Sequence, residues 1–180
     1  PLRRQRQMCI RDSFWNDVIV PLMALGIKKE HIICVPGNHD IQRTNIEENK
    51  IVYSSIVSQD FTERKFNDLL ESETQANILT KKFENYENFL KKKLECPYYN
   101  SIGYQIELND EWSVYCLNSS LTSFAGIDDS DHPMLKDDKG RLNIATRVLY
   151  QWVNVNSKKK ILVLHHPFEF LTEWAASELR

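Results

Sequence analysis

The amino-acid sequence predicts a single α/β domain, in which helices cover a sheet of partly parallel strands. The first observation is a set of short apolar runs of strand length, at residues 32–35, 104–108, 112–117 and 161–164. The second is that the stretches between them carry apolar residues at spacings of three and four, the period of a helix packed on one face. Strands and helices that alternate along a chain are typical of α/β folds. A chain of 180 residues with 42% hydrophobic content is long enough for a substantial core.

The first helix is predicted over residues 14–25, with its end at Gly26. Pro21 should kink or restart this helix, because proline lacks an N–H donor and crowds the preceding turn. The apolar run at 32–35 follows and predicts a buried parallel strand.

This run stops at a Pro-Gly turn, Pro36-Gly37, and then presents Asn38, His39 and Asp40 in a row. In α/β sheets, polar side chains at the carboxyl end of a parallel strand face the crevice where ligands bind. The stretch therefore predicts a functional site.

Residues 45–100 form the most helical part of the sequence, with charged residues and apolar residues at spacings near three and four. We expect a helical insertion that packs its apolar side on the core. The alternative is a dedicated partner-binding module. Because the segment follows the Asn-His-Asp turn directly, it is also a candidate lid over the site.

Two alternating runs, 104–108 and 112–117, predict a β-hairpin. Asn118 follows the second strand, where a turn-forming role and a place near the site are both open. The Asp-rich stretch 119–141 predicts a solvated loop. A helix over 142–154 and a further helix beginning near residue 169 complete the expected elements.

The second polar strand end lies far downstream, where the buried run 161–164 is expected to deliver His165 and His166. Together with Gly37-Asn38-His39-Asp40, this His-His-Pro segment resembles two motifs of the calcineurin-like metallophosphoesterases. The resemblance covers residues 14–180. It implies a partial four-layer α/β sandwich with a helical insertion, and an enzyme that hydrolyses a phosphate ester at a binuclear metal centre.

The resemblance also assigns roles. Asn38 and His165 would bind the same cation of a pair of Mn, Fe or Zn ions, which accept oxygen and nitrogen ligands. His39 would act on the phosphoryl group or the leaving oxygen, and Asp40 would orient it. A second group of side chains is implied as supporting or substrate-contacting residues: His166, Arg43 and Asn118.

Three other motifs of that family, Asp-x-His, Gly-Asp and Gly-His-x-His, are absent from the sequence. We therefore expect residues 14–180 to be a truncated phosphoesterase domain that is itself inactive, while its intact parent is active. Residues 1–13 are expected to be a non-native leader, since residues 3–12 resemble a translated sequencing adapter. The alternatives for this leader are a basic nucleic-acid arm and a transit peptide.

The composition limits the kinds of binding partner that we expect for this chain. A net charge of −2 gives no strong nucleic-acid signal, because sequence-independent binding needs many Lys and Arg residues. No apolar run approaches a membrane span, and the four scattered cysteines favour a reducing, cytoplasmic compartment. The expected partner is a small phosphate ester or a nucleotide. Two alternatives stay open: a catalytically degenerate scaffold or interaction module, and an unrelated α/β binding protein with accidental motif matches.

Overall fold

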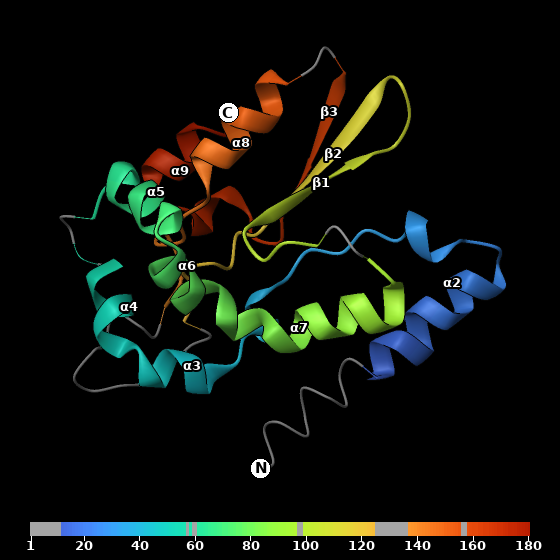
Figure 1. Cartoon of the computed structure of the whole chain (residues 1–180), viewed down its shortest axis with the longest axis horizontal. Coiled ribbons are helices and arrows are strands. Elements are labelled where there is room, and N and C mark those ends of the chain that lie inside the picture. The colour runs from blue at the N-terminus through green and yellow to red at the C-terminus, as the bar shows by residue number, and fades with distance from the viewer. Residues whose placement is uncertain (1–11, 57, 59–60, 97–98, 125–136, 156–157) are drawn as a thin grey trace.

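The computed structural model describes residues 12–56, 58, 61–96, 99–124, 137–155 and 158–180. Residues 1–11 of the expected leader lie outside this description. Figure 1 shows a small sheet with helices on both sides of it and a group of further helices at one end. The general α/β class predicted from the sequence is confirmed.

The sheet consists of β1 (Gly103–Glu107), β2 (Trp112–Leu117) and β3 (Lys159–Val163), in the order β1-β2-β3. β1 and β2 pair in antiparallel fashion, as the predicted hairpin requires, whereas β2 and β3 are parallel. The four-layer sandwich is not what the described residues form, because that architecture needs two sheets and they contain one sheet of three strands. The prediction that β3 is buried is also wrong, because β3 is an edge strand whose Ile161 is 38% exposed.

β2 is the central strand, and its side chains alternate between two helical layers. On one face Tyr115 stacks on Trp152 at a centroid distance of 5.2 Å. Trp152 belongs to α8 (Thr146–Asn154), which shares this core with α9 (Glu173–Ser177). On the other face Val114 and Cys116 pack with the amino-terminal helix and α7 (Glu84–Phe89). A strand that is covered on both faces has nearly all of its residues buried. In β2, five of the six residues are buried.

The amino-terminal helix has a π-helical part, Trp15–Ile19, followed by α2 (Val20–Ala24). The change lies just before Pro21. Because proline has no N–H to donate within the helix, the ladder loosens here, and the Val20 N–H bonds to the Trp15 carbonyl, five residues back. Gly26 ends the helix with a φ of +90°, as the sequence predicts.

The segment predicted as a helical insertion is helical. Its helices are α3 (Arg43–Glu48), α4 (Lys50–Ile56), α5 (Glu63–Glu71), α6 (Glu73–Thr80) and α7 (Glu84–Phe89), with a 3-10 turn at Lys81–Phe83 and a π-helical segment at Leu90–Leu94. Apolar residues of α3, α4, α5 and α6 pack in one buried cluster with Leu121 and Phe124, which follow β2, whereas α7 packs in the cluster on the Val114 and Cys116 face of β2. The insertion is therefore continuous with the core of the domain.

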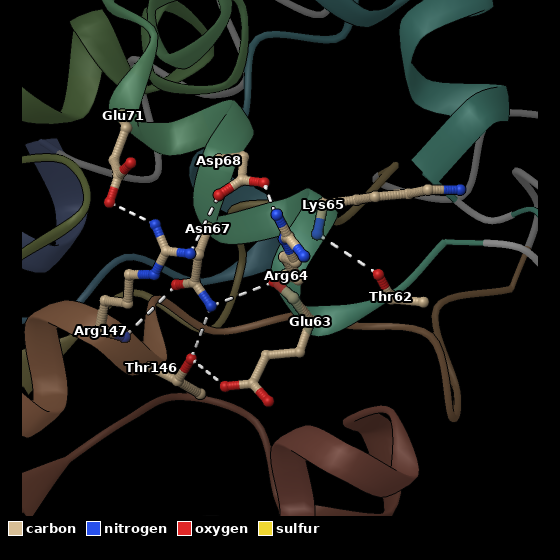
Figure 2. A network of polar contacts seen from close by, with 9 residues as sticks. All are labelled: Thr62, Glu63, Arg64, Lys65, Asn67, Asp68, Glu71, Thr146 and Arg147. Atoms are coloured by element: carbon tan, nitrogen blue, oxygen red, sulfur yellow. Dashed lines mark hydrogen bonds and ion pairs between the residues drawn. The ribbon is translucent and has the colours of Figure 1, made fainter.

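A buried amide joins this insertion to α8 (Figure 2). Asn67 of α5 donates to the Thr146 hydroxyl at 2.9 Å and accepts from the backbone N–H of Arg147 at 3.3 Å. Arg147 also pairs with Asp68 at 2.9 Å and with Glu71 at the exposed rim. Asn67 thus satisfies polar groups at the start of α8, where a helix has no internal partner for its first N–H groups.

The Asp-rich stretch 119–141 differs from the predicted solvated loop. Residues 125–136 lie outside the described part of the chain, but residues 119–124 are buried. Asp138 is also buried, and it accepts hydrogen bonds from the Ser123 hydroxyl and from the Phe124 N–H at 3.0 Å. Its carboxylate holds this return segment in the core instead of facing water.

Lys82 is fully buried beside this segment. Its Nζ donates to the carbonyl oxygens of Leu121 and Ser123, at 2.7 and 2.8 Å. The same nitrogen lies 4.9 Å from the centre of the Tyr53 ring. Burial lowers the Lys82 pKa well below its ordinary value, and the nearby Asp138 carboxylate opposes this shift in part.

None of the helices in the described ranges combines the length and hydrophobicity that crossing a membrane requires.

Candidate functional site

Residues 32–37 are extended but do not belong to the sheet, so the prediction of a buried parallel strand here is wrong. A strand needs a neighbour to complete its ladder, and no described strand pairs with this segment. Side chains hold it instead. The Tyr104 hydroxyl of β1 donates to the Cys34 carbonyl at 2.6 Å, and the half-buried Ile32–Val35 side chains pack against the core beneath the sheet.

The polar turn that follows is a single 3-10 turn, Asn38–Asp40. The Asp40 N–H bonds to the Gly37 carbonyl at 3.1 Å, and the Asp40 carboxylate accepts the Gly37 N–H at 3.0 Å. Asp40 therefore closes the turn that carries Asn38 and His39. Asn38 is half-buried, and His39 is exposed.

The two distant motifs meet at Gly37. A Cβ atom on Gly37 would lie 2.8 to 3.0 Å from Cε1, Nε2 and Nδ1 of the His165 ring. Three nearly equal distances mean that the ring lays its face over this Cα atom. The imidazole of His165 thus lies against the residue that immediately precedes Asn38.

The loop after β2 connects both motifs. Ser120 donates from its hydroxyl to the Pro36 carbonyl at 3.2 Å, and Ser119 accepts the His166 backbone N–H at 3.1 Å. Asn118 accepts the Ser120 N–H at 2.8 Å and donates to the Ser101 carbonyl at 2.6 Å. Asn118 is therefore a turn-forming residue with both ends of its amide engaged. The two serines were missed by sequence reasoning, and their only signal is that they follow Asn118 at a strand end.

His166 is 5% exposed, in contrast to the exposed His165 beside it. Its Nδ1 lies 3.0 Å from the Ser119 hydroxyl oxygen. The same oxygen also accepts the His166 backbone N–H at 3.1 Å, so one hydroxyl contacts both the backbone and the ring of His166. Nε2 is buried with no hydrogen-bond partner among the described residues. Burial, and secondarily the neighbouring His165, lowers the His166 pKa to about 4, so the ring is neutral at pH 7.

One further predicted residue follows the polar turn along the chain. Arg43 is half-buried at the first position of α3, three residues beyond Asp40. Within the described ranges, no group of three or more His, Cys, Asp and Glu side chains is arranged to hold a metal ion.

A groove of about 600 Å³ lies between α6 and residues 99–102, and Glu73, Asn77 and Ser101 contribute to its lining. None of the predicted metal or catalytic residues lines it. Its link to the site is the bond between Asn118 and the Ser101 carbonyl, so the groove is a neighbour of the candidate site and not its substrate pocket.

Comparisons of this chain with protein-family models, curated proteins and solved structures find no significant match.

Proposed function

We propose that this chain is part of a metal-dependent phosphoesterase of the calcineurin-like class. The observation that supports it most is the contact between Gly37 and His165. Two motifs that form one site in the resembled family have to meet in space, and these two lie in contact although they are far apart in sequence. Their side chains lie at the ends of segments held together by buried hydrogen bonds, which suits a site that needs fixed geometry.

The side chains beside this contact fit a divalent cation in their chemistry. Asn38 offers an amide oxygen and His165 an imidazole nitrogen, which are ligands that Mn, Fe and Zn ions accept. The missing side chain at Gly37 leaves room for the His165 ring close to Asn38. When bound, such cations polarise phosphoryl oxygens and lower the pKa of a bound water.

The remaining residues would act on the ester. His39 is exposed beside Asn38, and its imidazole would donate a proton to the leaving oxygen. Asp40 keeps the turn closed, which fixes the backbone that carries Asn38 and His39. Arg43 at the start of α3 would contact a phosphate oxygen. The substrate class is a phosphate ester, either a phosphodiester, a phosphomonoester or a nucleotide.

Two neutral ligands hold a divalent cation only weakly. We therefore propose that the binuclear centre also uses the Asp-x-His, Gly-Asp and Gly-His-x-His residues of the resembled family, which the 180-residue sequence lacks. On this proposal the 180-residue chain is inactive and a longer product of the same gene is active.

The test compares the longer protein with the 180-residue chain. The longer protein should hydrolyse bis(p-nitrophenyl) phosphate with Mn²⁺, and the 180-residue chain should not. His165→Ala and Asn38→Ala should each lower the rate of the longer protein by about 100-fold or more. His31→Ala is the matched control, because His31 is an exposed histidine at the other end of the same extended segment. A longer protein that carries the three motifs and shows no metal-dependent turnover would favour the degenerate scaffold.

A further inference from the structure

The tripeptide Asn118-Ser119-Ser120 makes buried hydrogen bonds to both motif segments. Ser119 and Ser120 are each 0% exposed. Ser120 bonds to Pro36, which precedes Gly37, and Ser119 bonds to the backbone of His166, which follows His165. Ser120 is thus bonded to the residue next to Gly37, and Ser119 is bonded to the residue next to His165.

The loop itself is held rigidly. Asn118 closes a turn onto the Ser120 N–H, and its backbone N–H and side-chain amide donate to Ile102 and Ser101. These bonds continue the β1 to β2 ladder past the end of the strands. The loop is therefore attached to the sheet by bonds that do not involve either motif segment.

We propose that Ser119 and Ser120 are positioning residues that set the place of His165 relative to Gly37 and Asn38. Residues 32–37 pair with no described strand. The bond from Ser120 to the Pro36 carbonyl therefore takes the place of a ladder hydrogen bond, directly before Gly37. The Ser119 hydroxyl contacts His166 at the backbone N–H and at Nδ1, which fixes the backbone and the ring together. The inference rests on the proposed function for the purpose of this arrangement, but the arrangement itself can be tested without metal or substrate.

The experiment uses nuclear magnetic resonance of the 180-residue chain. Because the His165 ring face covers one Hα of Gly37, that proton should resonate upfield, and His165→Ala should abolish the shift and so assign it. Ser119→Ala and Ser120→Ala should each reduce the upfield shift. The matched control is Thr122→Ala. Thr122 is also 0% exposed and its hydroxyl also accepts a backbone N–H, but from Asn143 at 2.9 Å, outside both motif segments.

The control separates positioning from general stability. Thr122→Ala should lower the free energy of unfolding as Ser120→Ala does, yet keep the Gly37 shift. A wild-type shift in folded Ser119→Ala and Ser120→Ala proteins, or an equal loss in Thr122→Ala, would refute the proposal. If Ser119→Ala does not fold, Ser120→Ala decides alone, since it removes a single bond to Pro36. Absence of hydrolysis by the longer protein would refute the function and leave this result standing.

Discussion

Gly37 shows how one residue without a side chain can determine a site. Its φ of −106° is open to any residue, so backbone conformation does not require glycine here. The requirement comes from the His165 ring, which occupies the space of a Cβ atom. A glycine in a polar turn is read from sequence as a backbone requirement, whereas this one makes room for a neighbour.

We expect Gly37→Ala to lower the free energy of unfolding by about 0.5–1.5 kcal/mol, because the added methyl group overlaps the exposed His165 ring and must displace it. In a His165→Ala background the same change should cost nothing, since the ring is gone and alanine restricts the unfolded chain. Urea denaturation of the four proteins of this double-mutant cycle measures the coupling. An equal cost in both backgrounds would show that the ring does not constrain Gly37.

Lys82 is the second residue whose position decides its chemistry. Its folded pKa lies well below the ordinary 10.5, so below pH 10.5 the unfolded chain binds a proton that the folded chain binds less readily. Stability therefore rises with pH in the interval between the folded pKa and 10.5, and falls as pH drops through it. The slope approaches about 1.4 kcal/mol per pH unit where the two states differ by one full proton.

The comparison of wild type with Lys82→Met tests this. As pH rises toward 10.5, the wild type should gain stability relative to the variant, measured by urea unfolding at each pH. The slope is diagnostic, because the constant offset also contains the loss of two hydrogen bonds to Leu121 and Ser123. Lys81→Met is the control, since Lys81 is the exposed neighbour, and it should run parallel to the wild type. Parallel curves for Lys82→Met would contradict the expected pH dependence.

At the scale of elements, the joint between α5 and α8 depends on one amide. Asn67 is 4% exposed and spans the two helices with both of its polar atoms (Figure 2). The surrounding ion pairs are exposed, and exposed pairs contribute little, about 0–1 kcal/mol.

We expect Asn67→Ala to cost about 1–3 kcal/mol, because the Arg147 N–H loses its side-chain partner at a buried helix start, and the Thr146 hydroxyl keeps only its bond to Glu63. Arg64→Ala is the control from the same helix: Arg64 is 87% exposed and pairs with Asp68 at 3.8 Å. It should change the unfolding free energy by less than about 0.5 kcal/mol. Equal costs for both variants would mean that the buried amide has no special role.

Elements were predictable where local pattern decides them. The hairpin and the helices of the insertion follow from periodicity, and the π-helical turn lies where Pro21 predicts a disturbance. The extended run at 32–35 has the same apolar character as β3, but strand formation depends on a partner that no local pattern specifies. Lys81 and Lys82 are chemically identical neighbours, and only tertiary packing makes one exposed and the other buried.

At the scale of the whole molecule, helices cover both faces of the sheet at its central strand β2. The predicted metal ligands lie past the carboxyl end of β2. The sequence predicted Asn38, His39 and His165 as candidates because polar residues follow apolar runs. It could not predict Ser119, Ser120 or the burial of Asp138, because their importance depends on segments distant in sequence. Residue type predicts chemistry, whereas the bonds between loops determine geometry.

The double attachment of the loop after β2 has a kinetic consequence. Ser120 meets Pro36 across 84 positions, and Ser119 meets His166 across 47. Contacts over such separations pay a large loop-closure entropy and form slowly. On the ribosome, the early segment with Asn38 must wait for the hairpin, and the assembly is completed only after His166 has left the exit tunnel. A nascent chain therefore carries Asn38 and His39 long before it can present them with His165.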